Sequence, residues 1–350
     1  MPTSMNRQWL LARRPRGDLS AEDFKWVETP IPAPGEGEIL VRNLCLSCDP
    51  TQRGWAAGDT YFPAVRIGDV MRSFAVGEII ESRDPQYRRG QLLQGLFGWQ
   101  DYAVAKQGGE FPLMPVPDGA SIETAMSLLG NTGITAYFGL LEVGGAHAGQ
   151  TVVVSGAAGA TGSAVGQIAK IIGCRVIGIA GGADKCRYLT EELGFDAAID
   201  YKADNIMTRL RETCSKGIDV YYDNVGGRIL DAALANLAFH GRVVICGAIS
   251  SYNDVAPPPG PKNYLKLLIV RGRMEGFVVI DFMPRANEAL TALAGWLAEG
   301  KIKDLVDVQH GLENAPAAVA RLFSGQNRGK QLVRIAEPSV QRTNATRREG

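Results

Sequence analysis

The chain has 350 residues, of which 45% are hydrophobic and 21% are charged, and this length and composition suit two globular domains. Its 37 Lys and Arg residues balance 37 Asp and Glu residues, so no overall charge attracts nucleic acid or an anionic membrane. The first residues, MPTSMNRQWLLARRP, contain no secretory hydrophobic region, and no run approaches the roughly 20 apolar residues of a membrane span. We therefore expect a cytoplasmic protein with no nucleic-acid or membrane partner.

Up to about residue 120, short strand-like runs alternate with turns rich in glycine and proline, such as IPAPGEGE. The expected strands are Ile39–Leu46, Ala75–Ser82 and Gln100–Ala105. This pattern is typical of an antiparallel, barrel-like β domain.

From Ser121 onward, predicted helices and strands alternate. After helices in SIETAMSLLG and ITAYFGLLEVG, we expect strands at Thr151–Ser155, Arg175–Ala180, Ala197–Asp200, Asp219–Asp223, Arg242–Gly247 and Arg273–Val279. Helices are expected in SAVGQIAKIIG, CRYLTEELG, IMTRLRETC and ILDAALANLAF, and at Leu290–Ala298. Repeated βα units predict a doubly wound parallel sheet with helices on both faces.

The last predicted helix and strand, in LENAPAAVARLF and GKQLVRI, are expected to return to the first domain. The sequence therefore predicts an α/β fold with two domains. The first, a β-barrel domain, covers residues 1–125 and is completed by 302–340, while the parallel-sheet domain covers 126–301. The polar tail over 341–350 is expected to be disordered.

The strongest local motif is TVVVSGAAGATGSAVGQIAK, in which an apolar strand runs into Gly156, Gly159 and Gly162 and then into a helix. Glycines permit a tight turn and let backbone N–H groups approach a pyrophosphate at the positive end of the helix. A glycine-rich turn alone is weak evidence, because such turns are common. Since this one opens a series of βα units, it predicts a dinucleotide-binding loop.

The residues after the next strand, RVIGIA, indicate which dinucleotide binds. In NAD sites an Asp or Glu at this strand end usually accepts a hydrogen bond from the ribose 2′-hydroxyl, whereas here Gly181 and Gly182 follow the strand. Lys185 comes next, and an ammonium attracts the 2′-phosphate that a carboxylate would repel. Asp184 is the contrary evidence, although it lies beyond the strand end, and Lys185 could instead be a solvated lysine at a helix start. The pattern favours NADPH.

The histidines and cysteines argue against a metal site. The chain has three histidines, each beside turn glycines or in GGAHAG, and six scattered cysteines. Cys45 and Cys48 form a C-x-x-C pair with no second pair and no nearby histidine, so we interpret them as buried thiols rather than as a metal or redox site. No Gly-His-Glu segment follows Cys48, where IGDVMRSFAVGE stands instead. We expect chemistry without zinc.

Several rare strings occur in one order along the chain, from about Arg7 to Ile335. They are SCDPTQRG, GWQDYAV, TGITAYFGLLEVG, SGAAGATGSAVGQIAK, AGGADKCRYL, YYDNVGG, ICGAISSYN, PPPGP, EGFVV, GLENAPAA and QNRGK. Together they resemble the zinc-independent medium-chain dehydrogenases/reductases, and among them the prostaglandin reductase (leukotriene 12-hydroxydehydrogenase) and bacterial NADPH-dependent curcumin reductase group. The resemblance implies a GroES-like domain joined to a Rossmann domain, a homodimer, and reduction of the C=C bond of small α,β-unsaturated ketones or aldehydes.

The resemblance also implies residue roles. The implied NADPH contacts are Ala158, Gly159, Ala160, Thr161, Gly162, Lys185, Tyr201, Asn224, Cys246, Gly247, Ala248, Ile249, Ser250, Ser251, Tyr252, Phe277, Val278, Val279 and Asn327. Candidates for the substrate pocket are Thr51, Arg53, Phe74 and Tyr264. No metal-ligating residue is implied.

Three segments depart from the family pattern. Thr51 and Gln52 replace an aromatic residue and Met, residues 72–74 stand where relatives carry glycines, and Asn131-Thr132 replaces Met-Pro. All three segments are expected in or near the cleft. We therefore expect a physiological substrate that differs from those of the characterised relatives.

Tyr252 is the residue that we expect to contribute to the chemistry. Hydride addition to the β-carbon of an enone leaves an enolate, whose oxygen needs a hydrogen-bond donor. The Tyr252 hydroxyl, or a cofactor ribose hydroxyl that it orients, could be this donor; alternatively, Tyr252 packs beneath the Pro-rich loop with its hydroxyl bound by the backbone. Two other functions stay open, namely quinone reduction and catalytically silent binding of NADPH.

Overall fold

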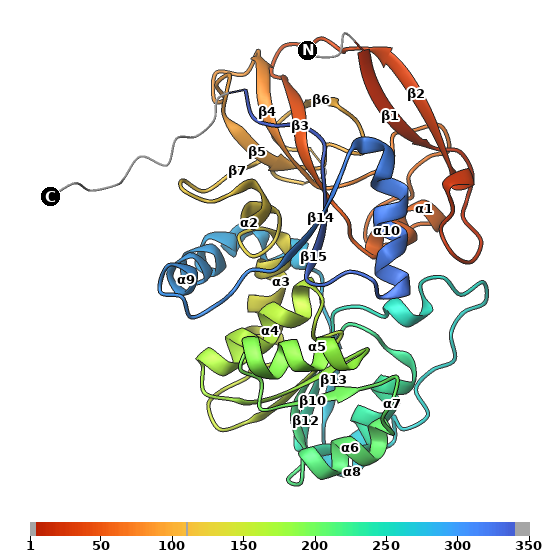
Figure 1. Cartoon of the computed structure of the whole chain (residues 1–350), viewed down its shortest axis with the longest axis vertical. Coiled ribbons are helices and arrows are strands. Elements are labelled where there is room, and N and C mark those ends of the chain that lie inside the picture. The colour runs from red at the N-terminus through yellow and green to blue at the C-terminus, as the bar shows by residue number, and fades with distance from the viewer. Residues whose placement is uncertain (1–4, 110, 340–350) are drawn as a thin grey trace, which may run out of the picture.

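The computed structural model describes residues 5–109 and 111–339. Two regions follow each other along the long axis of the molecule: a strand-rich region, red to orange in Figure 1, and a parallel sheet with helices, yellow-green to cyan. The blue C-terminal segment runs back from the second region to the first (Figure 1). The tail predicted over 341–350 lies outside the described residues.

The strand-rich region contains an antiparallel hairpin and a seven-stranded sheet. The hairpin is formed by β1 (Met5–Leu11) and β2 (Phe24–Pro30). The sheet has the order β14-β15-β3-β4-β5-β7, with β6 paired to β3. Its strands are β3 (Ile39–Ser47), β4 (Ala75–Ser82), β5 (Leu92–Gly95), β6 (Tyr102–Ala105), β7 (Met114–Pro115), β14 (Val306–His310) and β15 (Lys330–Arg334).

The C-terminal segment is an integral part of this sheet. Strand β15 pairs antiparallel with β3, and β14 pairs parallel with β15. The helix α10 (Ala315–Ser324) buries Val319 in the same core as Leu11, Trp55 in the short helix α1 (Thr51–Ala57), and Val333. Residues at both ends of the described chain therefore stabilise one hydrophobic core.

The second region is a six-stranded sheet in which all strands are parallel, with the order β10-β9-β8-β11-β12-β13. Val152, Val153 and Val154 of the central strand are fully buried, as expected when helices cover both faces of a parallel sheet. Val152 and Val154 belong to one core and Val153 to the other, because side chains alternate along a strand. The strands are β8 (Thr151–Ser155), β9 (Arg175–Ala180), β10 (Ala197–Asp200), β11 (Ile218–Asp223), β12 (Leu237–Ile245) and β13 (Arg273–Gly276).

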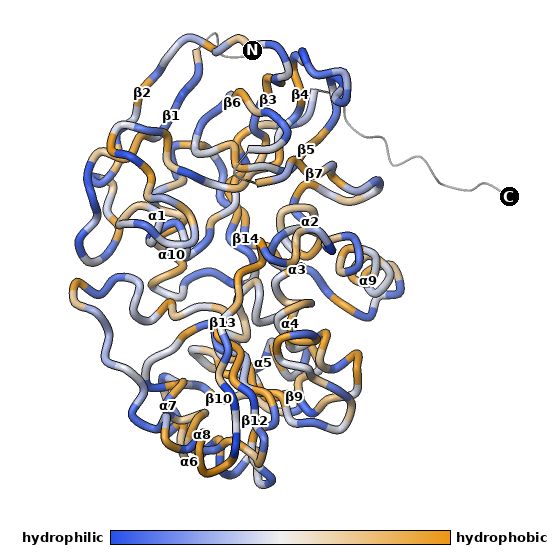
Figure 2. Tube along the Cα trace, turned by 180° about the vertical axis from the view of Figure 1, so that it is seen from behind, coloured by the Kyte–Doolittle hydropathy of each residue, from blue (hydrophilic) through white to orange (hydrophobic). Residues whose placement is uncertain are grey.

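Helices cover both faces of this sheet. One core packs against α3 (Asn131–Phe138), α4 (Ala160–Ile171) and α9 (Ala286–Ala298). The other packs against α6 (Ile206–Thr213), α7 (Gly227–Ala235) and α8 (Lys266–Val270), and the short helices α2 (Ile122–Met126) and α5 (Ala183–Arg187) complete the set. Figure 2 shows hydrophobic residues concentrated along the strands between these layers.

The predicted two-region α/β fold is confirmed, and β4, β8, β9 and β10 have the expected bounds. The helix expected to run through Phe239 is wrong at its end, because it stops at Ala235 and β12 already begins at Leu237. Leu237 pairs with Ile218, and a register shift with a positive φ of 59° at His240 carries the strand into its regular part. The strand expected over Arg273–Val279 ends at Gly276. The hairpin β1–β2, the helix α1 and the strand β14 were not predicted.

Candidate active site

The glycine-rich loop turns the chain sharply between β8 and α4. Gly156 has a φ of 59°, and a methyl group added at Gly162 would lie 2.4 Å from the Gly156 carbonyl oxygen, so the turn needs glycine at both positions. No side chain caps the N-terminus of α4. The Asn224 side-chain amide donates to the Ser155 carbonyl oxygen at 2.7 Å, which fixes the loop to the end of β11. The first amides of α4 are thus available to an anion at the positive end of the helix.

A cavity of about 470 Å³ lies at the carboxyl ends of the parallel strands, against the strand-rich region. In an open α/β sheet this edge is where ligands bind. Its wall includes most residues that the sequence associated with a cofactor: Ala158, Gly159, Ala160, Thr161, Gly162, Lys185, Tyr201, Asn224, Cys246, Gly247, Ile249, Ser250, Tyr252 and Asn327. The strand-rich region contributes Cys48, Asp49, Pro50, Thr51, Lys330 and Gln331 to the same wall.

Lys185 lies in this wall, and its ammonium donates to the carbonyl oxygens of Gly325 (2.8 Å) and Asn327 (2.7 Å). Burial lowers the pKa of Lys185, and the nearby charge of Lys202 lowers it further. Asp184, the carboxylate that argued against NADPH, pairs with Arg187 and does not line the cavity. The acidic side chain next to Lys185 therefore does not oppose a phosphate in the cavity.

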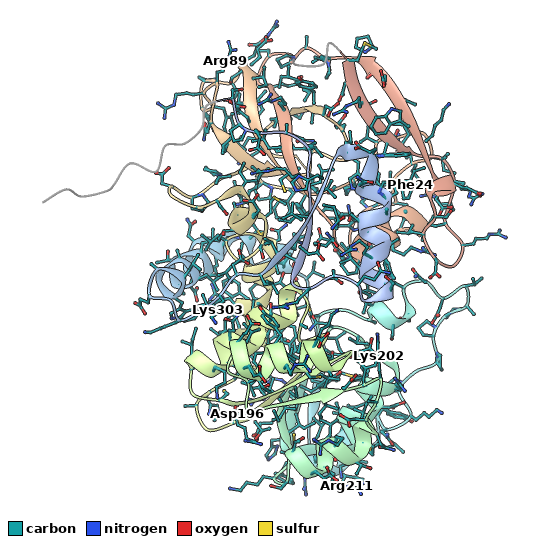
Figure 3. All side chains as sticks on the ribbon, viewed as in Figure 1. Phe24, Arg89, Asp196, Lys202, Arg211 and Lys303 are labelled. Carbon is teal, nitrogen blue, oxygen red and sulfur yellow. The ribbon has the colours of Figure 1, made fainter. Side chains whose placement is uncertain are left out.

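Two further cationic side chains, Lys202 and Arg228, line the same end of the cavity as Tyr201. Arg228 donates to the Tyr201 carbonyl oxygen at 2.9 Å. The Tyr201 ring lies so close to Gly181 that a methyl group there would be 2.8 Å from it. Figure 3 labels Lys202 on the part of the parallel-sheet region that faces the strand-rich region. Together with Lys185, these side chains create a positive site suited to a phosphate.

The Tyr252 hydroxyl accepts a hydrogen bond of 3.1 Å from the Ala248 amide, and its ring lines the large cavity. Burial raises the pKa of Tyr252, so the phenol stays protonated at neutral pH. Because the backbone amide occupies an acceptor site of the oxygen, the O–H proton remains available for donation. The residue therefore combines a backbone-bound hydroxyl with a place at the cavity.

A second cavity, of about 130 Å³, adjoins the first and shares Asp49, Thr51, Thr132, Thr161 and Lys330 with it. Aromatic and thioether side chains form much of its remaining wall: Tyr61, Phe74, Phe111, Met114 and Met126. The rings of Phe74 and Phe111 meet edge to face, with centroids 4.8 Å apart. A small cavity whose wall combines apolar rings and thioethers with polar side chains suits a small organic molecule.

An ion pair lies where the two cavities meet. The Lys330 ammonium, whose side chain is 3% exposed, lies 2.5 Å from an Asp49 carboxylate oxygen, and the other oxygen accepts from the Ser47 hydroxyl at 2.5 Å. The Asp49 amide donates to the buried side chain of Gln52 at 2.8 Å. Lys330 begins β15 and Ser47 ends β3, so the pairing of these strands brings the charges together.

Comparison with known proteins places this site in a family. Residues 7–113 match the family model described as the N-terminal domain of oxidoreductases, and residues 160–294 match the model described as zinc-binding dehydrogenase. The chain is 42% identical over 337 residues to the NADPH-dependent curcumin reductase of Escherichia coli (strain K12). The aligned region covers 95% of this chain and 97% of the relative. The chain belongs to the medium-chain dehydrogenase/reductase family.

One further relative and one solved structure show the same family relationship. Prostaglandin reductase 1 of Mus musculus is 38% identical over 94% of this chain and 98% of its own length. The crystal structure of CurA from Vibrio vulnificus in complex with NADPH superimposes with a TM-score of 0.89 at 39% identity, over 95% of this chain and 100% of that chain. This medium-chain dehydrogenase/reductase therefore matches its relatives over nearly their whole length.

Some residues expected at the site do not line the large cavity of this family member. Among the cofactor contacts, Ala248, Ser251, Phe277 and Val278 line neither cavity, and Val279 lines the smaller one. Arg53 is buried and donates to the carbonyl oxygens of Pro15 and Gly17, so its guanidinium fixes a loop of the strand-rich region. Tyr264 is 56% exposed and also outside both cavities. Of the four substrate-pocket candidates, the structure brings Thr51 and Phe74 to the cavities.

Sequence reasoning missed Asp49, Lys330, Lys202, Arg228 and Tyr61, which all line a cavity. Lys202 follows Tyr201 directly, and Lys330 stands in the QNRGK string, so neighbouring motif residues offered a signal for both. Arg228 follows the YYDNVGG string in the same way. For the pairing of Asp49 with Lys330 no local pattern exists, because the two residues are 281 positions apart.

The family member shows neither a clustered metal-ligand set nor a membrane-crossing helix in residues 5–109 and 111–339. No three His, Cys, Asp or Glu side chains of this part converge as metal ligands do. No helix there combines the length and apolar character that crossing a membrane requires. Cys45 and Cys48 are free and buried, and burial raises the pKa of Cys45 to about 12 and that of Cys48 further.

Proposed function

We propose that this chain reduces the carbon–carbon double bond of α,β-unsaturated ketones and aldehydes with NADPH. The observation that carries the proposal is the junction of the two cavities, where a dinucleotide site opens directly into a small, mostly apolar site. A planar enone fits such a site, because its polar carbonyl needs one hydrogen-bond donor and its substituents need apolar walls. The relatives named for enone or NADPH chemistry support the same activity.

The residues of the large cavity fit NADPH. The uncapped N-terminus of α4 and the glycine loop would hold the pyrophosphate, and Lys185, Lys202 and Arg228 would surround the 2′-phosphate. When bound, the nicotinamide supplies the hydride that adds to the β-carbon of the enone. Thr132, Thr161 and the Asp49–Lys330 pair lie where both cavities meet and would position the reacting groups.

The chemical task of the protein is to stabilise the enolate oxygen that forms when the double bond is reduced. We assign this task to the Tyr252 hydroxyl, which donates either to that oxygen or to a ribose hydroxyl that it orients. The Ala248 amide fixes the phenol oxygen, and the raised pKa keeps it protonated. Zinc is not needed in this scheme, and the raised pKa of Cys48 opposes the thiolate form that binds zinc. Metal analysis of the purified protein tests this point.

Replacement of Tyr252 by Phe tests the assignment. We expect kcat/KM for an enone to fall by about 100- to 1,000-fold, as when one oxyanion donor is removed, while NADPH binds as before. Tyr264→Phe is the matched control, since Tyr264 lies outside both cavities. Parallel assays with an enone and a quinone decide between the proposed activity and quinone reduction. Unchanged turnover in Tyr252→Phe would remove Tyr252 from the mechanism.

We further infer that the chain forms a homodimer through the edge of the parallel sheet. Strand β13 ends the sheet and is exposed along its length, so its edge is open to a second strand. Large apolar side chains are exposed beside it on β12, β13 and α8 and in the segment before α8: Phe239, Tyr264, Leu265, Leu268, Ile269 and Met274. Such a patch suits burial against a second copy.

Sedimentation tests the dimer. The wild-type chain is expected to sediment as a dimer, and the double replacement of Leu268 and Ile269 by Lys should shift it toward the monomer because it places two charges in the apolar contact. A wild-type monomer at micromolar concentration would contradict the inference.

We also propose a cytoplasmic location, which cell fractionation tests. We propose in addition that the chain divides into one domain of residues 1–125 with 302–340 and a second domain of residues 126–301. Limited proteolysis tests this division.

A further inference from the structure

A hydrogen bond between the two regions lies directly beside Tyr252. The Asn253 side-chain amide donates to an Asp18 carboxylate oxygen at 2.6 Å. Asp18 lies in the loop between β1 and β2 of the strand-rich region, whereas Asn253 follows Tyr252 in the parallel-sheet region. Because a hydrogen bond to a carboxylate is stronger than one between neutral groups, this contact can hold the two segments together.

The loop that carries Asp18 is firmly attached to its own region. The buried Arg53 side chain donates to the carbonyl oxygens of Pro15 and Gly17 at 3.0 to 3.3 Å. Arg14 of the same loop donates to two carbonyl oxygens in and beyond α1. Gly17, with a φ of 74°, turns the chain immediately before Asp18. Asp18 is therefore an exposed carboxylate in a fixed position.

The segment that carries Tyr252 is attached to the parallel-sheet region at its start. The Ile249 amide donates to the Asn224 carbonyl oxygen at 3.2 Å, and the Ser250 amide donates to the Val225 carbonyl oxygen at 3.1 Å. The Ser250 hydroxyl donates to the same Val225 oxygen at 2.6 Å. These bonds fix the chain before Tyr252.

After Tyr252 the chain has few other attachments. Asp254 closes a turn within the segment, and residues 255–262 then form no hydrogen bond or ion pair in the part of the chain that the structure describes. All of residues 255–262 except Pro261 are exposed. The next attachment is the Asn263 amide, which donates to Asp231 at 3.1 Å. The bond of Asn253 to Asp18 is therefore the contact that fixes the chain just after Tyr252.

The Asn253 amide gains from this contact at one end and loses at the other. Its Nδ2 atom donates to Asp18, whereas its Oδ1 atom is buried and has no partner among the described residues. A buried acceptor without a partner is destabilising, so it offsets part of the stabilisation that the bond to the carboxylate contributes. We therefore expect Asn253 to leave this position for water once Asp18 no longer accepts its hydrogen bond.

We propose that Asp18 is a positioning residue of the reductase site, which holds Tyr252 in place at the large cavity through Asn253. The inference rests on the proposed function and adds a residue of the strand-rich region to it. Asp18 lines neither cavity, so its effect on the reaction passes through the Tyr252 segment. Misplacement of a catalytic group by about 1 Å can slow a reaction by about a hundredfold, so a remote contact of this kind influences the chemistry.

Single-turnover reduction of benzylideneacetone at saturating NADPH tests the proposal. We expect Asp18→Ala and Asn253→Ala each to slow hydride transfer by about three- to tenfold, the range that one exposed hydrogen bond allows. Asp254→Ala is the matched control, because it removes a neighbouring exposed carboxylate that forms no hydrogen bond or ion pair with described residues. NADPH titration of each variant shows whether its cofactor site is intact.

Two combined variants give results that a merely structural role would not produce. Asp18→Asn together with Asn253→Asp exchanges donor and acceptor, so it should restore most of the wild-type rate. Asn253→Asp alone places two carboxylates against each other and should be slower than Asn253→Ala. Asp18→Ala added to Tyr252→Phe should slow hydride transfer no further than Tyr252→Phe alone, because both changes act on the same hydroxyl.

The outcomes separate this inference from the proposed function. A wild-type chain that binds NADPH but reduces no enone contradicts the function and, with it, the inference. If the wild-type chain reduces the enone and Asp18→Ala does so equally fast, the inference alone is overturned. It is also overturned if the exchanged pair restores nothing, if the losses of Asp18→Ala and Tyr252→Phe are additive, or if Asp18→Ala weakens NADPH binding without slowing hydride transfer.

Discussion

The two cavities of the site are built in different ways. On its parallel-sheet side, the large cavity draws on the ends of successive parallel strands, where residues such as Gly156 after β8 and Tyr201 after β10 follow their strand closely. The smaller cavity combines segments from residue 47 to residue 330, including part of α3, and the pairing of β15 with β3 brings the two ends of this range together. The turns of the proposed cofactor site are therefore recognisable in short motifs, whereas the proposed substrate site depends on long-range pairing.

This difference decides which parts of the site the sequence could predict. The glycine loop was predictable because a strand, glycines and a helix follow each other directly, and the βα alternation fixed the sheet edge where they act. Arg53 and Tyr264 were assigned to the substrate pocket from the family resemblance alone. The direction of a side chain depends on packing, and Arg53 turns toward the Gly17 carbonyl oxygen while Tyr264 faces outward.

The same contrast applies to the fold. Strands β8, β9 and β10 are short apolar runs bounded by glycines, and their bounds follow from composition. The end of α7 was predicted too far along the chain, because the helical pattern of apolar residues continues through AALANLAF, past the point where the helix stops. The position of Leu237 is decided by its pairing with Ile218 in the neighbouring strand, and single-sequence periodicity does not contain that contact.

Removal of the long-range ion pair should produce the largest effect. Lys330→Met leaves the partly buried Asp49 carboxylate without its cation, and breaking such a pair costs about 3 kcal/mol or more. We expect the free energy of unfolding of the cofactor-free protein to fall by about this amount in urea titrations. Lys301→Met is the control, since the exposed pair of Lys301 with Glu299 contributes about 1 kcal/mol at most. Equal effects of both changes would show that strand pairing, and not the charge pair, holds the smaller cavity.

A methyl group added in the glycine-rich loop should have the next largest effect. Gly162→Ala forces its Cβ against the Gly156 carbonyl oxygen, and overpacking of this kind costs about 1–3 kcal/mol. We expect NADPH affinity to fall by about ten- to a hundredfold in fluorescence titrations. Gly295→Ala makes the same change in α9, where no atom lies within 4 Å of the added methyl group. If Gly162→Ala binds NADPH as the wild-type chain does, the glycine-rich loop does not form the cofactor site that we propose.

Removal of one cationic side chain near the expected 2′-phosphate should have the smallest effect of the three changes. Lys202→Ala removes one of three cationic side chains near the expected 2′-phosphate, and we expect NADPH affinity to fall by about fivefold, with less loss at high salt. Affinity for NADH should stay the same, because it has no 2′-phosphate. Arg211→Ala is the control, since Arg211 lies on α6 at the far end of the molecule from Lys202's cavity (Figure 3). A similar loss for both cofactors would move Lys202 away from the 2′-phosphate.

The segment of residues 325–330 joins the two regions by its main chain. The Gly329 amide donates to the Ala158 carbonyl oxygen at 2.9 Å, in a parallel bridge between Gly159 and Gly329, and Lys330 follows at once as the first residue of β15. Residues 325–330 thus connect the glycine-rich loop to the Asp49–Lys330 ion pair beside the smaller cavity. If the cleft widens to release a nucleotide, either the hydrogen bonds of this segment to Ala158 and Lys185 break or β15 moves along β3, so release and the geometry of the reacting centre are coupled through residues 325–330.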